Sequence, residues 1–215
     1  MAKDSAKTPQ ARLFVALDLP DDVRDAIRRW QGRQLGDSAL RPMPADQLHI
    51  TLAFLGNRPE KAIDRIGELV TGIEPRPVPL RFEPEAAPVP KGRPRLFALN
   101  ARSPEAVELQ GEVSRALAGA GFYEPEDRAF WPHITVARVR TERLPPKKGE
   151  RKGRSRPRRV GNPPGPLPAA LTERAFAAVR LRLYRSNLKP TGAEYEALAG
   201  LDLPPAPEAT QRRGD

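Results

Sequence analysis

Two short stretches of this chain carry the same pattern: LHITLAFLG at residues 48–56 and FWPHITVARV at residues 130–139. Each contains a His-Ile-Thr triplet, beginning at His49 and at His133, and the chain has no other histidine. The triplets lie 84 positions apart, so they are not a local repeat. The alternation predicts two strands in which the histidine and threonine share one face and the aliphatic residues share the other. Two such faces, placed opposite each other, would form a polar cleft.

The paired histidines are candidates for acid–base catalysis. A single histidine is more often structural than catalytic, but two in matching motifs favour a shared role. Near neutral pH one imidazole can accept a proton while another donates one, so two imidazoles can carry out an in-line displacement at phosphorus without a metal. The hydroxyls of Thr51 and Thr135 would hold the non-bridging phosphate oxygens. From a free-imidazole pKa of about 6.5, we expect a bell-shaped pH profile with an optimum roughly between pH 6 and 8.

Other catalytic chemistries lack their motifs in this sequence. There is no HExxH pattern, and neither triplet has an adjacent carboxylate in ligand register. There is no GxSxG nucleophile motif. The absence of cysteine excludes disulfides, thiolate zinc sites and a cysteine nucleophile. We therefore expect neither a metal nor another cofactor.

Hydrophobic periodicity predicts helices and strands in alternation around the two motifs. The predicted helices cover residues 21–35, 59–74 and 103–118, the last with Ser103 as N-cap and Pro104 in its first turn. The predicted strands cover residues 12–19, 48–55, 78–83, 95–101, 133–139 and 175–184. Short connections such as residues 83–95 allow antiparallel neighbours, so we expect an α+β fold. A helix followed by a His-Ile-Thr strand occurs twice, which suggests two similar lobes that face each other.

Composition marks the segments that lie outside this pattern. We expect one domain over residues 11–203, flexible tails at residues 1–10 and 204–215, and a basic, Pro/Gly-rich exposed loop at residues 141–168. No run of 18 or more apolar residues could span a membrane, and the N-terminus lacks the apolar core of a secretory signal. We expect a cytoplasmic monomer.

Positive charge is concentrated in one part of the chain. The net charge is +10, and residues 147–159 alone carry eight lysines and arginines against Glu150. This segment is either a solvated loop or an arm that attracts phosphate, and both interpretations remain open.

Beyond the two motifs, the opening RLFVALDLP (residues 12–20) and the ending LYRSNLKPTGAEYEAL (residues 183–198) complete a family pattern in the family's order. Together the four blocks resemble the two-histidine (2H) phosphoesterases, specifically the LigT-like RNA 2′,3′-cyclic phosphodiesterases of bacteria and archaea. The resemblance spans nearly the whole chain, although residues 147–159 are not part of the family pattern. It implies a bilobal α+β fold with a pseudo-twofold axis, in which two antiparallel-sheet-plus-helices lobes surround a central cleft.

The resemblance also implies roles for the site residues. His49 would donate a proton to the leaving 3′ oxygen of an RNA 2′,3′-cyclic phosphate, and His133 would accept a proton from the attacking water. The product would be a 2′-phosphomonoester. Thr51 and Thr135 match phosphate-contacting hydroxyls, and Arg138 matches a phosphate-binding arginine. Five positions along a regular strand would place Arg138 on the face opposite His133, so its role requires a bend or bulge.

Four alternatives to this hydrolysis remain open at the level of sequence. The same chemistry could serve 2′-5′ RNA ligation, which replaces water by an RNA hydroxyl. It could act on another small cyclic phosphate, such as ADP-ribose 1″,2″-cyclic phosphate, or trim an RNA tail. A protein without catalytic activity could instead bind RNA through the basic loop.

Overall fold

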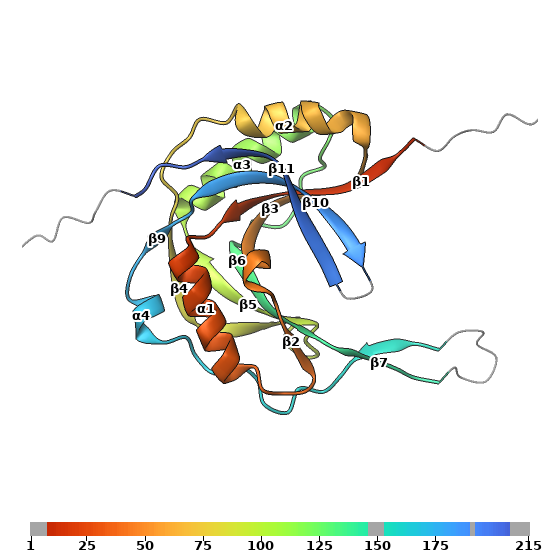
Figure 1. Cartoon of the computed structure of the whole chain (residues 1–215), viewed down its shortest axis with the longest axis vertical. Helices are drawn as coiled ribbons and strands as arrows, with labels where there is room; N and C mark the ends of the chain where they lie inside the picture. Colours follow the sequence, from red (N-terminus) through yellow and green to blue (C-terminus); the bar gives the residue numbers. More distant parts are fainter. Residues whose placement is uncertain (1–7, 146–152, 190–191, 207–215) are drawn as a thin grey trace, which may run out of the picture.

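The computed structural model describes residues 8–145, 153–189 and 192–206 (Figure 1). Its helices are α1 (Asp21–Gln34), α2 (Ile63–Thr71), α3 (Pro104–Gly119) and α4 (Ala169–Thr172), with 3-10 turns η1 (Ala45–Gln47) and η2 (Glu60–Ala62). Its strands are β1 (Gln10–Asp18), β2 (Leu40–Pro42), β3 (His49–Pro59), β4 (Pro79–Val89), β5 (Leu96–Arg102), β6 (His133–Val139), β7 (Thr141–Arg143), β8 (Ser155–Pro157), β9 (Phe176–Ala177), β10 (Arg180–Lys189) and β11 (Gly192–Asp202).

A curled antiparallel sheet organises the fold. Among the described residues it has nine strands, in the order β11-β10-β1-β3-β6-β5-β4-β9, with β2 paired to β6 beside this path. Few backbone pairs join the two halves of the sheet, because β3 and β6 pair only at Ile50 opposite Ile134. Each half of the sheet therefore ends on one His-Ile-Thr strand at this junction. The expected α+β class is confirmed, and the two motifs meet where the halves join.

The helices cover the sheet and complete one continuous apolar core. Figure 1 shows α2 and α3 together over the half that contains β10 and β11, with α1 lying toward the other half. Helix α1 buries Val23, Ile27 and Trp30, the positions that its helical spacing predicts. The buried Gln31 amide donates hydrogen bonds to the carbonyls of Met43 (3.1 Å) and Val136 (2.8 Å). These bonds hold α1 against the strand that carries His133.

The start of α3 forms as its sequence predicts. The Ser103 side chain accepts a hydrogen bond of 2.9 Å from the backbone N–H of Ala106, and Pro104 occupies the first turn. The serine satisfies a helix donor that would otherwise have no partner.

The C-terminal part of the chain differs from the expectation. The predicted strand at residues 175–184 is two strands, β9 and the longer β10, and β11 was not predicted. The expected irregular loop at residues 141–168 contains the β7–β8 hairpin, and its Leu167 is buried in the core. Residues 146–152 of that loop lie outside the described residues.

Both predicted tails also lie mostly outside the described residues, namely residues 1–7 and 207–215. Within the described tail residues, Gln10 already belongs to β1, and residues 204–206 have no regular structure. None of the described helices is both long enough and apolar enough to span a bilayer.

Candidate active site

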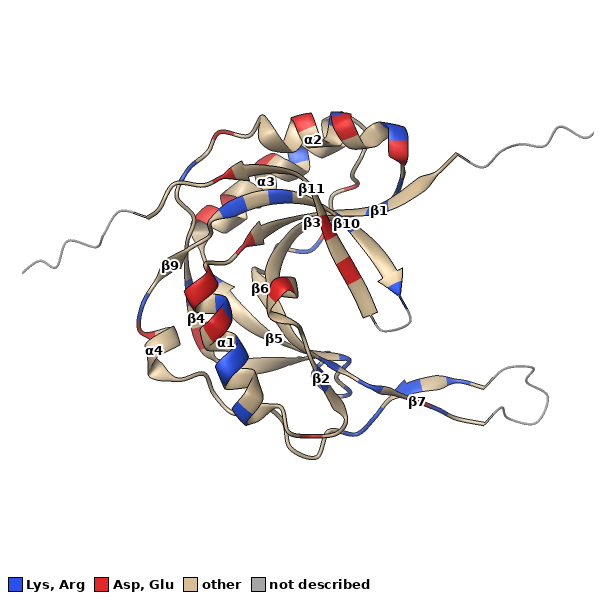
Figure 2. Ribbon diagram, in the orientation of Figure 1, with Lys and Arg blue, Asp and Glu red and all other residues tan. Residues whose placement is uncertain are grey.

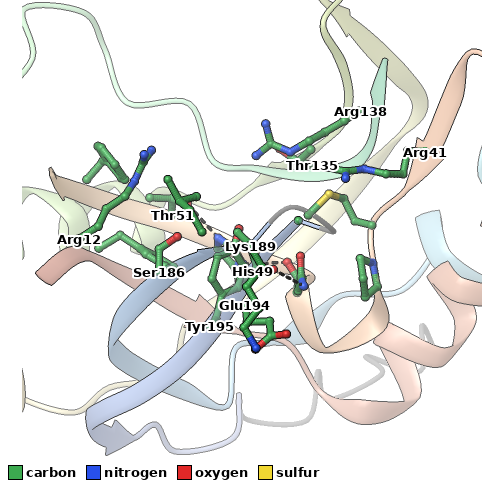
Figure 3. Close-up of a pocket in the computed structure, with 18 of the residues that line it drawn as sticks. Arg12, Arg41, His49, Thr51, Thr135, Arg138, Ser186, Lys189, Glu194 and Tyr195 are labelled. Atoms are coloured by element: carbon green, nitrogen blue, oxygen red, sulfur yellow. Dashed lines mark hydrogen bonds and ion pairs between the residues drawn. The ribbon is translucent and has the colours of Figure 1, made fainter. Parts of the chain in front are cut away.

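The two histidines line one cavity of about 820 Å³ between the halves of the sheet. Both occupy the first position of their strand, and Thr51 and Thr135 line the same cavity (Figure 3). In both strands the intervening isoleucine is fully buried in the core. The alternation seen in the sequence therefore places the motif residues as predicted, with the polar side chains facing one space.

Backbone carbonyls fix the orientation of both imidazole rings. The Nδ1 atom of His49 lies 2.8 Å from the Gln47 carbonyl oxygen, and the Nδ1 atom of His133 lies 2.8 Å from the Trp131 carbonyl oxygen. A carbonyl can only accept a hydrogen bond, so each Nδ1 carries a proton and donates it. Each Nε2 is therefore the atom that gains or loses a proton. The Nε2 atom of His49 is also 3.1 Å from the Thr51 hydroxyl.

Burial lowers the pKa of both rings. For His49 the pKa falls to about 4, chiefly through desolvation, with smaller lowering contributions from the positive charges of His133 and Arg138. The hydrogen bond to Gln47 opposes this shift. The pKa of His133 is also lowered, again mainly by desolvation. Both shifts favour the neutral imidazole at pH 7, and a bound anion would raise both pKa values.

Aromatic side chains surround His49. The ring centroid of Phe14 lies 5.0 Å from that of His49, and Tyr195 contacts the imidazole edge-on with centroids 5.3 Å apart. Tyr184 stacks on the other side of this group, 5.2 Å from Phe14. These contacts desolvate the imidazole, which accounts for much of its lowered pKa.

A buried carboxylate supports the aromatic group. Asp18 is 3% exposed and accepts a 2.6 Å hydrogen bond from the Tyr184 hydroxyl. The Arg182 guanidinium lies 3.3 Å from the second carboxylate oxygen. Burial and the neighbouring carboxylate raise the pKa of Tyr184 to about 12, so the phenol stays protonated and remains a donor. This network holds the tyrosine against Phe14, which in turn packs on His49.

On the other side of the cavity, His133 is stacked on a tryptophan. The rings of Trp131 and His133 are nearly parallel, at 15°, with centroids 4.2 Å apart. The Trp131 indole N–H donates a 3.1 Å hydrogen bond to the Asn100 side chain. The tryptophan therefore restricts the His133 ring by stacking as well as through its backbone carbonyl.

Matching β-bulges re-aim the residue five positions after each histidine. In β6 the register with β5 shifts so that Thr135 and Ala137 face consecutive partners, and Arg138 then lines the cavity with His133. The bulge that the sequence argument required is present. In β3 a corresponding shift places Phe54 on the cavity, 47% exposed. The two halves therefore present an arginine and a phenylalanine at equivalent positions.

Several cavity residues have no motif that would have revealed them. Arg41 is the cross-strand partner of Arg138, and Figure 3 shows both on the same side of the cavity. Arg12 lies on another side, its guanidinium carbon 4.7 Å from the centroid of the Phe54 ring. Arg12 belongs to the block RLFVALDLP, but nothing in that block pointed to the cavity. Phe54 had a positional signal, because it occupies the position in the first motif that Arg138 occupies in the second. Among the described residues, no group of three or more His, Cys, Asp or Glu side chains could hold a metal ion.

The geometry agrees with comparisons to known proteins. Residues 19–150 match the model of the 2′-5′ RNA ligase superfamily. An RNA 2′,3′-cyclic phosphodiesterase of Thermus thermophilus is 30% identical over 201 residues, covering 89% of this chain and 90% of the relative. The protein of the same name from Methanocaldococcus jannaschii is 27% identical, covering 87% of this chain and 98% of the relative.

Solved structures show the same fold. The crystal structure of Escherichia coli LigT in its apo form aligns with a TM-score of 0.69 at 26% identity, covering 90% of this chain and 98% of LigT. The Thermus thermophilus protein TT0787 aligns with a TM-score of 0.68 at 28% identity, covering 89% of this chain and 97% of that protein.

Proposed function

The chain belongs to the 2′-5′ RNA ligase superfamily, and we propose that it hydrolyses RNA 2′,3′-cyclic phosphate ends to 2′-phosphomonoesters by acid–base catalysis with His49 and His133. The observation that carries the proposal is that both imidazoles present Nε2 to one cavity while backbone carbonyls hold both Nδ1 protons. Curated relatives at 27–32% identity are RNA 2′,3′-cyclic phosphodiesterases, which supports the reaction class.

The proposed step is an in-line displacement at phosphorus. Water attacks the phosphorus atom opposite the 3′ oxygen, and the Nε2 atom of His133 takes its proton. The P–O3′ bond breaks, and His49 donates its Nε2 proton to the departing 3′ oxygen. The phosphate stays on the 2′ oxygen, and the two imidazoles exchange protonation states, so the starting forms return through solvent. Two imidazoles supply both proton transfers, so the step needs no metal ion.

The negative charge of the substrate favours the protonated form of His49, which is the form that acts as the acid. Burial lowers the pKa of His49 to about 4, so its ring is neutral at pH 7. An anionic phosphodiester beside the ring favours the imidazolium, and an opposite charge within about 4–6 Å typically shifts a pKa by 1–3 units. We expect substrate binding to raise the pKa of His49, so that the ring takes up a proton from solvent. The catalytic protonation state of His49 is therefore favoured only when the substrate is bound.

The remaining cavity residues suit the rest of the substrate. The hydroxyls of Thr51 and Thr135 and the guanidinium of Arg138 would contact the non-bridging oxygens, where negative charge grows in the transition state. The exposed Phe54 ring offers a surface on which the terminal nucleobase can stack, and Arg12 lies over the same ring.

Product identification tests the proposal. Protein treated with EDTA is incubated with an RNA oligonucleotide that ends in a 2′,3′-cyclic phosphate, and the phosphomonoester is identified against 2′- and 3′-phosphate standards. We expect the 2′-phosphate alone, and no product from the His49→Ala/His133→Ala variant, which controls for contaminating nucleases. A 3′-phosphate product, or no turnover, contradicts the assigned reaction. Activity lost with EDTA and restored by zinc or manganese contradicts metal independence. Adding an RNA with a free 5′-hydroxyl reports 2′-5′ ligation as a longer product.

A further inference from the structure

A second cavity of about 660 Å³ adjoins the catalytic cavity and is lined largely by arginine. We call this cavity the arginine groove. It shares two residues, Arg41 and Arg138, with the catalytic cavity. Its other arginines, which we call the groove arginines, are Arg95, Arg140 and Arg158. Among the described residues no acidic side chain lines it, and the remaining lining is Val139, Thr141, Ser155 and Pro157.

Backbone pairing brings these arginines together from four segments. Arg41 of β2 lies directly opposite Arg138 of β6. The Arg95 carbonyl accepts a 2.8 Å hydrogen bond from the backbone N–H of Val139. The Arg140 carbonyl accepts a 2.8 Å bond from the backbone N–H of Arg158. Thr141, Ser155 and Pro157 of the β7–β8 hairpin line the groove, so the hairpin supplies one of its walls. Figure 1 shows β7 projecting away from the main sheet.

Four arginines of the groove carry charge that ion pairs within the described part of the chain do not neutralise. Arg95, Arg138, Arg140 and Arg158 form no ion pair with another described residue, and all four are exposed. The nearby Glu142 of β7 is already paired with Arg156 of β8. Figure 2 shows the basic residues gathered around β7. Positive charges gathered in one groove repel each other, so an anion bound among them would lower that repulsion.

The position of the groove indicates which anion it accepts. In RNA that ends in a 2′,3′-cyclic phosphate, the strand continues only through the 5′ oxygen of the terminal nucleoside. The phosphates of the preceding nucleotides therefore lie one after another along a path that leads out of the catalytic cavity. The groove adjoins that cavity at Arg41 and Arg138, which line both. Guanidinium groups form paired hydrogen bonds with phosphate oxygens. We propose that the arginine groove binds the phosphates of the RNA strand 5′ of the cyclic end, and so makes the enzyme prefer RNA ends to cyclic mononucleotides. This inference rests on the proposed function.

Kinetics on two substrates test the inference. The variant Arg95→Gln/Arg140→Gln/Arg158→Gln removes three charges without touching the lining of the catalytic cavity. Its control, Arg28→Gln/Arg29→Gln/Arg33→Gln, removes three exposed charges from α1 that line neither cavity. Each protein is assayed on a 2′,3′-cyclic mononucleotide and on an eight-nucleotide RNA with the same cyclic end.

We expect the groove variant to lose about tenfold or more in kcat/KM on the oligonucleotide, because it can no longer form charge-assisted hydrogen bonds with the RNA phosphates. Its activity on the mononucleotide should change by less than about twofold, because the residues that bind the terminal phosphate are intact. The control variant should keep both activities. Unmodified protein should favour the oligonucleotide more at 50 mM than at 200 mM salt. The groove variant should show a shallower dependence, by about 0.7 in logarithmic slope for each phosphate that it no longer neutralises.

Equal losses on both substrates, or an equal loss in the α1 control, would overturn the inference. So would a substrate preference in the unmodified protein that salt does not change, and this result needs no variant. An unaffected oligonucleotide rate would assign the groove to another anionic partner, such as an acidic protein segment. If the unmodified protein hydrolyses neither substrate, the proposed function itself fails. Circular dichroism of each variant excludes loss of folding as the cause.

Discussion

The pH dependence of catalysis should differ between the free enzyme and the substrate complex. Burial lowers the pKa of His49 to about 4 and lowers that of His133 below its ordinary 6.5. A reaction that needs one imidazole protonated and the other neutral gives a bell centred on the mean of the two values. For the free enzyme that mean lies below the ordinary imidazole value, because both pKa values are lowered. A bound phosphodiester would raise both pKa values, by about 1–3 units each.

The profile of kcat/KM reports the free enzyme, and that of kcat reports the complex. We therefore expect the kcat bell to be centred about 1–3 pH units above the kcat/KM bell. The optimum that free imidazole suggests, roughly between pH 6 and 8, is expected for the complex and not for the free enzyme. Rates should be measured from pH 4 to pH 10 with a cyclic mononucleotide, whose phosphodiester keeps one negative charge throughout. Single-turnover rates separate the chemical step from product release.

Coinciding centres would refute the argument that substrate charge protonates His49, and a kcat that keeps rising through pH 10 would indicate a different base. At the acidic end of the pH range, loss of activity must be distinguished from acid unfolding. Because folding depresses these pKa values, the unfolded chain binds protons more readily below pH 6.5, and stability falls as the pH drops from there toward 4. Circular dichroism at each pH sets the usable range.

Further substitutions test other parts of the site and the fold. Arg138→Gln should lower kcat/KM by about tenfold to a hundredfold, the effect of losing a charged hydrogen bond. It should also raise the pKa of His49, which NMR of the ring would follow, because the Arg138 charge lowers that pKa; an unchanged rate would remove Arg138 from the phosphate site. Phe54→Ala should weaken binding of cyclic nucleotides by about 1–3 kcal/mol while sparing a cyclic phosphate that has no base, and equal losses on both would contradict stacking. Ile134→Ala should cost about 2–5 kcal/mol in urea unfolding, because the side chain is fully buried where β3 meets β6; a loss below about 1 kcal/mol would mean that this junction contributes little.

The sequence was sufficient to predict the parts of the site that strand alternation determines. His49 and His133 begin strands with an inward isoleucine at the next position, so their shared polar face follows from the period of two. The α3 start followed from Ser103 and Pro104, whose capping chemistry is local. The sequence showed that Arg138 needs a bulge to reach the cavity. It could not show where the bulge lies, because that depends on the register of β6 with β5.

The features that the sequence did not predict depend on contacts between distant segments. Strand β11 is rich in alanine, glutamate and glycine, which are poor strand formers, and it is a strand because β10 pairs with it along its length. Arg41 has no motif, and it reaches the cavity because β2 pairs with β6 opposite Arg138. The β7–β8 hairpin was not predicted, because the charged and proline-rich sequence there is typical of an exposed loop.

The central claim is that His49 acts as the acid and His133 as the base, and a sulfur-substituted substrate tests it most directly. Each histidine-to-alanine variant should lose about 10²- to 10⁴-fold in rate, and the double variant little more, because both proton transfers belong to one step. With the 3′ oxygen of the cyclic phosphate replaced by sulfur, the departing thiolate needs no proton, since thiols have a pKa of about 8.5. The account predicts that this substrate substantially restores His49→Ala and leaves His133→Ala impaired. Rescue of His133→Ala alone would reverse the two roles, and near-normal rates of either variant on the ordinary substrate would contradict the two-histidine mechanism.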